Sequence, residues 1–418
     1  MIIKRKIINL KTVYIACLFL LISFTGLPIY RNPLSDILMA QEYLPDEGVP
    51  VEKVEKVEKN ESFGITNGRK YNLEDFFAQN EELDEVVNLL MDKLTDEEKI
   101  SQMVISYFTQ NVSPSDVVLD LIWNKKTGGV IFFEDSADEI NNLTEIFNDA
   151  ARSSSSVLLP IFAIDGEPSF IRYQFGLAGS LPMTGSIETE EESRRVAETI
   201  ALILKDMGLH INYAPVCDIS FNREIIGNRS FGSDIEMVSV LSYAFIESTQ
   251  AKGIVATAKH FPGHGSVRGD THKVLIFVEG KPPELPVFRY AIENGVISVM
   301  VGHIGVRNHD KYDTGGKPSS LSRNIVTGLL KNELGFKGIV VTDAMKMEAV
   351  RSFPMPSYEA ARAGCDMILM PDDERLFIRT VQKEIQIDEM FRHQIMDSVR
   401  KIIRLKVCLG LINDAEDE

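Results

Sequence analysis

The chain has 418 residues, of which 44% are hydrophobic and 25% charged, a balance typical of globular proteins rather than disordered or collagen-like ones. Its 61 acidic residues outnumber 44 basic ones, for a net charge of −17. Since such a surface repels phosphate backbones, we expect no nucleic-acid partner, although a locally basic pocket could still bind an anionic ligand. Only one long apolar stretch is present, which argues against a polytopic membrane protein.

The N-terminal stretch is typical of an export signal. Basic residues from Lys4 to Lys11 precede an apolar run from Val13 to Phe24, which is shorter than the roughly 20 residues that a bilayer-spanning helix needs. Three fates stay open: cleavage as a signal peptide, retention as a membrane anchor, and acylation at Cys17 as in a lipoprotein. In each case we expect an exported protein that is periplasmic, associated with the cell envelope or secreted.

We divide the chain into three parts. Residues 1–40 are the signal peptide or membrane anchor, residues 41–84 a linker and lead-in, and residues 85–418 the catalytic body. The linker repeats V-E-K between Val51 and Lys59, with a period that fits neither a strand nor a long heptad seam. We interpret it as a solvated spacer.

Eight apolar, β-rich runs follow, alternating with amphipathic helical segments such as 188–204 and 324–334. Continuous rather than alternating apolar residues indicate strands that are buried on both faces, as in a parallel sheet. Eight such units predict an α/β protein with a (β/α)8 TIM barrel as its single catalytic domain, and a doubly wound sheet is the alternative. Two closing helices are expected near 374–385 and 389–409. The eight runs are 103–108, 129–133, 158–165, 211–216, 254–260, 297–303, 339–343 and 366–370.

Ionisable side chains lie at or just beyond the C-terminal ends of these runs. A single Asp there could be a helix N-cap, but five such ends are hard to explain by capping alone. The C-terminal ends of barrel strands converge on one face, where such barrels build their active sites. The sequence therefore predicts an active site formed by Asp165, Asp218, the Lys259–His260 pair, His303 and Asp343.

The densest group of chemically active residues is the segment K-H-F-P-G-H-G-S-V-R-G-D-T-H, from Lys259 to His272. Its Pro and Gly disfavour a helix, so His260 and His264 are not expected to share a helical face as in zinc proteases. Asp270 lies two positions before His272, and a carboxylate beside an imidazole can fix its tautomer and raise its basicity. The alternative interpretation of this pair is an Asx-turn beside an exposed His.

This segment resembles glycoside hydrolase family 3, in particular its bacterial single-domain β-N-acetylglucosaminidases. Further similar blocks follow in the family's order across most of residues 90–375. Each block alone is a modest match, but nine in the right order are specific. Besides K-H-F-P-G-H-G they are LTDEEKISQM (94–103), GGVIFF (128–133), IDGEPSFIR (164–172), GLHINYAPVCD (208–218), GNRSFGSD (227–234), VMVGH (299–303), SLSRNIVTGLLKNEL (320–334) and GFKGIVVTDAM (335–345).

The resemblance implies a role for several residues. Asp343, in V-V-T-D-A-M, would be the nucleophile that attacks the anomeric carbon. His272 and Asp270 would form the acid/base dyad, which first protonates the leaving oxygen and later activates water. The residues implied to hold the sugar hydroxyls and N-acetyl group are Asp165, Arg229, Lys259 and His260, with Arg172 and His303 as further contributors.

The function so implied is that of a retaining, exo-acting β-N-acetylhexosaminidase. It would hydrolyse terminal β-linked N-acetylglucosamine from peptidoglycan fragments or chitin-type oligosaccharides through a covalent glycosyl–Asp intermediate. Only residues 371–418 follow the eighth run, so we expect the acid/base to come from within the barrel. The partner is a carbohydrate, no metal or organic cofactor is implied, and a monomer is expected.

Three alternatives to this function stay open. Because a neutral imidazole repels an anionic acceptor less than a carboxylate does, phosphate could replace water, which would make the protein a glycoside phosphorylase of the same family. A catalytically inactive, sugar-binding barrel is the second alternative. The third is a metal-dependent barrel hydrolase with His260, His264, His272 and Asp343 as ligands.

The sequence departs from the family pattern after Asp165, where Glu167–Pro168–Ser169 replaces E-G-G. Because Pro fixes φ near −65°, whereas Gly permits close backbone approach, we expect this loop to follow a different path. The departure puts the positions of Asp165 and Arg172 in question. Since it removes no proposed chemical group, we expect altered substrate preference rather than loss of activity.

Overall fold

The computed structural model describes residues 71–109, 115–133, 136–177, 179–221, 226–267 and 274–413. The predicted signal peptide or anchor and the V-E-K segment lie outside the described residues, as do Asp270 and His272. Within the described part of the chain, no helix is both long enough and apolar enough to cross a membrane.

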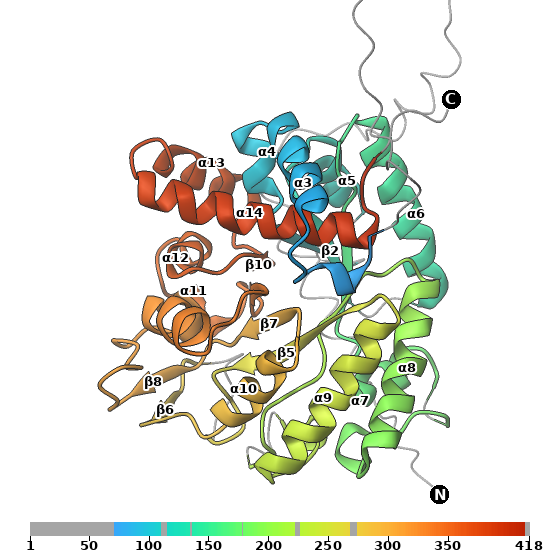
Figure 1. Ribbon diagram of the computed structural model, residues 1–418, viewed down its shortest axis with the longest axis vertical. Coiled ribbons are helices and arrows are strands. Elements are labelled where there is room, and N and C mark those ends of the chain that lie inside the picture. The colour runs from blue at the N-terminus through green and yellow to red at the C-terminus, as the bar shows by residue number, and fades with distance from the viewer. Residues whose placement is uncertain are drawn as a thin grey trace, which may run out of the picture. The chain divides into compact units, whose positions relative to one another are not determined.

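Eight parallel strands form the centre of the described domain (Figure 1). They pair in the order β10-β1-β2-β3-β4-β5-β7-β9, and a parallel bridge between Val341 and Met367 joins the two ends of this sheet. Each strand overlaps one of the eight predicted runs, so the prediction of a (β/α)8 barrel is confirmed. The strands are β1 (Val104–Phe108), β2 (Gly129–Phe132), β3 (Ile161–Ile164), β4 (Ile211–Asn212), β5 (Val255–Phe261), β7 (Ser298–Val301), β9 (Ile339–Thr342) and β10 (Ile368–Leu369).

Helices follow the strands and surround the barrel. The predicted helical segments are found as α8 (Glu190–Asp206) and the π-helix η5 (Asn324–Glu333), and the two closing helices as α13 (Glu374–Glu384) and α14 (Glu389–Leu409). The other helices are η1 (Leu73–Asp75), α3 (Glu81–Lys93), α4 (Asp96–Ser101), α5 (Ser115–Trp123), α6 (Ala137–Ser153), α7 (Pro168–Gln174), η2 (Thr184–Ser186), η3 (Gly227–Arg229), α9 (Ile235–Ala251), α10 (Leu285–Glu293), η4 (Ser319–Leu321), α11 (Glu348–Arg351) and α12 (Pro356–Ala363).

Local sequence signals account for several helix ends. Thr95 before α4 and Ser136 before α6 each accept the backbone N–H of a Glu three residues later, and that Glu accepts the N–H of the capping residue in return. At the other end of the domain, α14 stops at Gly410, which takes the left-handed conformation with φ of 73°.

Close packing fixes the spacing of the first three strands. The residues of β2 and β3 are buried throughout, because one face meets the barrel interior and the other meets the helices. A Cβ on Gly129 would lie 2.4 Å from the carbonyl oxygen of Ile161 on β3, so only glycine fits at this point.

A buried lysine closes the end of the barrel at which the strands begin. The Nζ of Lys406 on α14 donates to Gln102 Oε1 (2.6 Å) and to the carbonyl oxygens of Gly128 (2.9 Å) and Leu159 (2.8 Å), which precede β2 and β3. Burial lowers the pKa of Lys406 to about 7. Burial, together with the charge of Lys406, also lowers the pKa of His210 to about 3.

A second, smaller sheet and a contact between helices from the two ends of the described chain lie outside the barrel strands. A small parallel sheet of β6 (Phe277–Glu279) and β8 (Gly305–Arg307), which the sequence analysis did not predict, joins the chain after β5 to the chain after β7. Helix α14 packs against α3 and α4, so the first and last described helices lie side by side (Figure 1).

Candidate active site

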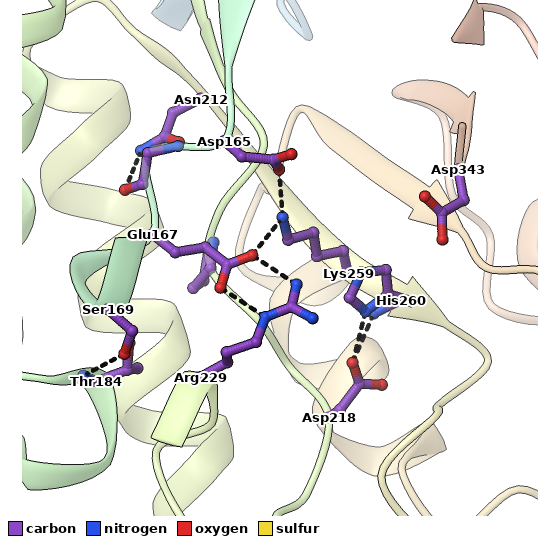
Figure 2. Close-up of polar contacts among 12 residues, drawn as sticks. Asp165, Glu167, Ser169, Thr184, Asn212, Asp218, Arg229, Lys259, His260 and Asp343 are labelled. Atoms are coloured by element: carbon purple, nitrogen blue, oxygen red, sulfur yellow. Dashed lines mark hydrogen bonds and ion pairs between the residues drawn. The ribbon is translucent and has the colours of Figure 1, made fainter. Parts of the chain in front are cut away.

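The predicted site residues come from separate strands and meet where those strands end. Asp165 directly follows β3, Asp218 follows β4, Lys259 and His260 lie at the end of β5, and Asp343 directly follows β9. Figure 2 shows two neighbouring sets of polar contacts, Asp165 with Lys259 and Asp218 with His260, and Asp343 faces Lys259 and His260 from the other side. The barrel geometry therefore brings together residues that lie up to 178 positions apart in the chain (343 − 165 = 178).

The centre of the group is the buried Lys259, of whose side chain only 2% is exposed. Its Nζ donates to Asp165 Oδ1 at 2.5 Å and to Glu167 Oε1 at 2.6 Å. Glu167 is also buried and accepts two hydrogen bonds from Arg229, from Nε to Oε2 at 2.9 Å and from Nη2 to Oε1 at 2.7 Å. Two cations, Lys259 and Arg229, thus share two carboxylates, and we call these residues together with Asp165 and Glu167 the charge cluster. The Asp165 side chain remains one-third exposed toward solvent.

Attraction between opposite charges keeps Glu167, Lys259 and Arg229 ionised. Burial alone would raise the pKa of Glu167, but Lys259 and Arg229 outweigh it and lower that pKa to about 2. Burial would lower the pKa of Lys259, yet Asp165 and Glu167 raise it. The pKa of Arg229 is likewise raised by Glu167 against the effect of burial. The site therefore presents fixed charges over the whole neutral range.

The Glu167–Pro168–Ser169 departure forms a helix start rather than a glycine-rich turn. Pro168 is the first residue of α7, a position where its missing N–H costs nothing. Ser169 Oγ donates to the carbonyl oxygen of Asn228 at 2.7 Å and lies 3.0 Å from Thr184 Oγ1. These contacts tie α7 to η2 and η3, and so to the segment that carries Arg229.

The residue after Asp165, Gly166, fits closely against Asn212 on β4. The amide of Gly166 donates to Asn212 Oδ1 at 2.9 Å, and a Cβ on Gly166 would lie 2.7 Å from that oxygen. The residue after Asp165 must therefore be small for Asn212 on β4 to hold the loop.

Asp218 orients His260 and the turn that follows it. Asp218 is fully buried, and its Oδ2 lies 2.7 Å from His260 Nδ1 while Oδ1 accepts the backbone N–H of His264 at 2.7 Å. Burial would raise the pKa of Asp218, but His260 and His264 lower it, so the carboxylate is an acceptor. Since a carboxylate only accepts, His260 donates its Nδ1–H to Asp218.

Asp343 is a carboxylate held by the turn that follows β9. Its Oδ1 accepts the N–H of Ala344 at 2.8 Å. Burial would raise its pKa, but His260, His303, the Ala344 amide and Lys259 lower it, so Asp343 is ionised at neutral pH. His303 is buried, with Nε2 donating to the carbonyl oxygen of Ala344 (3.0 Å) and Nδ1 facing Ser320 Oγ (2.7 Å). His303 thus holds the turn that carries Asp343.

The remaining predicted residues are placed less centrally or not described. Arg172 lies in α7, with its guanidinium 5.1 Å from the ring centre of Tyr173. Asp270 and His272 lie outside the described residues, so their roles stay predictions. Among the described residues, no group of three or more His, Cys, Asp and Glu side chains is arranged to hold a metal ion.

Sequence reasoning did not assign Glu167 to the site, although the structure places it at the centre of the charge cluster. The available signal was its position two residues after Asp165, on a loop that ends a strand. A buried carboxylate needs a cation, and Lys259 and Arg229 were already candidates.

Comparison with known proteins identifies the family. The model of the glycosyl hydrolase family 3 N-terminal domain matches residues 95–405. The chain belongs to this family. It is a glycoside hydrolase, and the resemblance seen in the sequence is confirmed.

Relatives within family 3 support this assignment. A beta-hexosaminidase of Vibrio cholerae serotype O1 is 34% identical over 263 residues, which are 60% of this chain and 77% of that protein. A family 3 beta-N-acetylglucosaminidase from Paenibacillus sp. FPU-7 superposes with a TM-score of 0.68 at 29% identity, over 78% of this chain and 64% of that one. The chain thus spans slightly less than two thirds of the Paenibacillus structure. A beta-N-acetylhexosaminidase from Beutenbergia cavernae shares the fold, with a TM-score of 0.65 at 24% identity over 75% of this chain and 99% of that one.

Proposed function

We propose that this family 3 protein is a retaining, exo-acting β-N-acetylhexosaminidase that hydrolyses terminal β-linked N-acetylglucosamine. The observation that carries the proposal is the ionised Asp343, which faces Lys259 and His260 at the end of β9 (Figure 2). The names of the Vibrio and Paenibacillus relatives supply the sugar class.

The described residues can divide the chemistry of the first step. Asp343 attacks the anomeric carbon and forms a glycosyl ester, which is the intermediate of a retaining mechanism. Lys259 and Asp165 offer a donor and an acceptor for sugar hydroxyls, and Glu167 with Arg229 keeps both in place. His260, whose Nδ1 is held by Asp218, keeps its Nε2 available for a further contact with the sugar in this proposal.

The acid/base role falls to His272 with Asp270 in this proposal. His272 donates a proton to the leaving oxygen and then takes one from the attacking water. His272→Ala should therefore slow substrates with poor leaving groups far more than nitrophenyl glycosides, which need little acid assistance. Equal losses on both kinds of substrate would argue against this role.

The proposed setting is the cell envelope. The basic and apolar N-terminal segment suggests export, with either a cleaved signal or a retained membrane tether, and peptidoglycan fragments are then the accessible substrates. Fractionation of the native host, with mass spectrometry of the mature N-terminus, tests this. A full-length chain in the cytosol would contradict it.

The deciding experiment compares the purified full-length protein with Asp343→Asn on nitrophenyl β-N-acetylglucosaminide. Loss of a nucleophile should reduce kcat by at least about a thousandfold. The matched control is Asp310→Asn, which changes an exposed aspartate and should leave turnover unchanged. Trapping with a slow fluorinated glycoside should add one sugar mass to the peptide that contains Asp343.

The same assay separates the alternatives. Turnover that needs phosphate and releases a sugar phosphate would indicate a phosphorylase, and turnover abolished by a chelator would indicate a metal-dependent hydrolase. Sugar binding without turnover in the wild-type protein would indicate an inactive sugar-binding barrel.

A further inference from the structure

A buried carboxyl group outside the charge cluster lies beneath the loop that follows β5. Glu284 directly precedes α10, its side chain has no exposed surface, and neither carboxyl oxygen accepts a hydrogen bond of normal geometry. A buried polar group in this state needs an explanation, because leaving it unsatisfied costs free energy.

The loop is shaped around this carboxyl group. Gly263 has φ of 127°, and a Cβ there would lie 2.5 Å from both Cδ and Oε2 of Glu284. On the other side of the same turn, a Cβ on Gly265 would lie 1.7 Å from the carbonyl oxygen of Ile219. The turn from Gly263 to Ser266 is therefore held between Glu284 and the chain that follows Asp218.

The turn connects Glu284 to His260, which we propose contacts the sugar. The backbone N–H of His264, within the turn, donates to Asp218 Oδ1, and Asp218 Oδ2 holds His260 Nδ1, both at 2.7 Å. The amide of Gly263 also donates to the carbonyl oxygen of His260 at 2.8 Å, so movement of the turn would be passed to His260 both through Asp218 and through this backbone contact.

The charges around Glu284 favour its neutral form. Burial and the negative charge of Asp218 raise its pKa to about 8, although its own amide and those of Gly265 and Ser266 oppose the shift. Burial lowers the pKa of His264, on the turn, although the charge of Asp218 opposes this shift. Ionisation of Glu284 would add a second buried negative charge, which the charge of Asp218 opposes.

We propose that Glu284 is a positioning residue, which as a neutral carboxylic acid holds the Gly263–Ser266 turn against Asp218 and thereby keeps His260 in place for the sugar. The positioning role of Glu284 does not depend on the proposed function, but its expected effect on KM rests on that function. Ionised Glu284 repels Asp218, so the turn shifts and sugar binding weakens.

The test compares the pH dependence of KM for wild type and Glu284→Gln, in which an amide imitates the neutral acid. If only the protonated form binds sugar, the KM of the wild-type protein rises about tenfold per pH unit above pH 8. Glu284→Gln keeps a KM near the wild-type value at pH 7 and shows no such rise. Glu293→Gln, an exposed substitution on the same helix, keeps the wild-type profile. A wild-type KM that is flat above pH 8, or an equal rise in Glu284→Gln, overturns the proposal.

An unfolding experiment tests the same inference without turnover. The folded pKa lies above that of the unfolded chain, so the wild-type protein loses stability relative to Glu284→Gln as the pH rises from about 4.5 to about 8, and the difference is constant above that. A difference in unfolding midpoint that does not change over this range overturns the neutral-acid role. If wild type and Glu284→Gln show this pH-dependent difference in unfolding but neither protein hydrolyses the glycoside, the result contradicts the proposed function and supports the role of Glu284.

Discussion

Two lysines are buried at opposite ends of the barrel, and their surroundings give them opposite properties. Lys259 at the catalytic face contacts Asp165 and Glu167, which raise its pKa. Lys406 at the other end contacts an amide oxygen and two backbone carbonyl oxygens, and burial lowers its pKa to about 7.

The comparison shows that burial alone does not decide the charge of a side chain. A buried ammonium group keeps its proton where a carboxylate compensates for lost hydration, and loses affinity for it where only dipoles are present. Lys259 therefore keeps its positive charge at the face where we propose that the sugar binds. Lys406 acts as a hydrogen-bond donor that fastens α14 to the start of two strands.

Removing the lysine at the catalytic face should have the largest effect. Lys259→Met leaves Asp165 and Glu167 without one of their cations, which should destabilise the protein by about 3 kcal/mol. It should also lower kcat/KM by at least about a hundredfold, because a sugar contact and the geometry of the cluster are both lost. Urea unfolding and steady-state kinetics measure the two effects. A stable variant with normal kinetics would remove Lys259 from the site.

Removing the other lysine should change the pH dependence of stability and leave the active site unaffected. The folded pKa of Lys406 is about 7 and the unfolded value about 10.5, so the folded state binds fewer protons between these values and wild-type stability rises with pH. Between pH 7 and 10 the wild type should gain about 4 kcal/mol relative to Lys406→Met. Unfolding of both proteins at several pH values measures this gain. Parallel curves would mean that Lys406 remains charged.

A third prediction concerns the stability that the protein loses at low pH, when Glu167 is protonated. The pKa of Glu167 is about 2 in the folded state, below the 4.5 of a solvent-exposed glutamate, so its ion pairs stabilise the protein above pH 4.5. This contribution, about 3 kcal/mol in full, is lost as the pH falls from 4.5 toward 2. Glu167→Gln should lack this loss, as unfolding midpoints between pH 5 and 3 would show. The same slope in both proteins would contradict the ion-pair assignment.

The smallest effect is expected from a single acceptor of Lys406. Gln102→Leu removes the side-chain oxygen and keeps the two carbonyl acceptors, so the protein should lose about 1 kcal/mol at neutral pH. Turnover should not change, because Gln102 lies at the far end of the barrel. Thermal unfolding measures the loss, and Lys93→Ala, at the exposed end of α3, is a suitable control.

The sequence was sufficient for the barrel and for the strand ends at which the candidate site residues lie. Continuous apolar runs indicate burial on both faces, and an ionisable residue directly after such a run, such as Asp165 or Asp343, indicates the end of the barrel at which these residues meet. Lys406 could not be identified, because a lysine in an amphipathic helix is indistinguishable by pattern from an exposed one. Glu284 precedes a helix and matches an ordinary helix start, so only three-dimensional contacts with Gly263 separate it from a surface residue.

The small sheet of β6 and β8 was also missed for a physical reason. Each strand has only three residues, and each gains its partner from a segment that follows a different barrel strand. Such short pairs carry no periodic signal of their own, whereas the eight barrel strands are supported by long apolar runs.

The pairing of β1 with β10 has a consequence for the order in which this protein matures. Val104 pairs only after Ile368 has been synthesised, and the carbonyl groups of Gly128 and Leu159 gain their donor only after Lys406 has been synthesised. The ring therefore closes after its other strands have formed, and until then the nascent chain exposes the edge of β1. Any ribosomal stall before α14 is complete would leave an open sheet for chaperones or proteases to recognise.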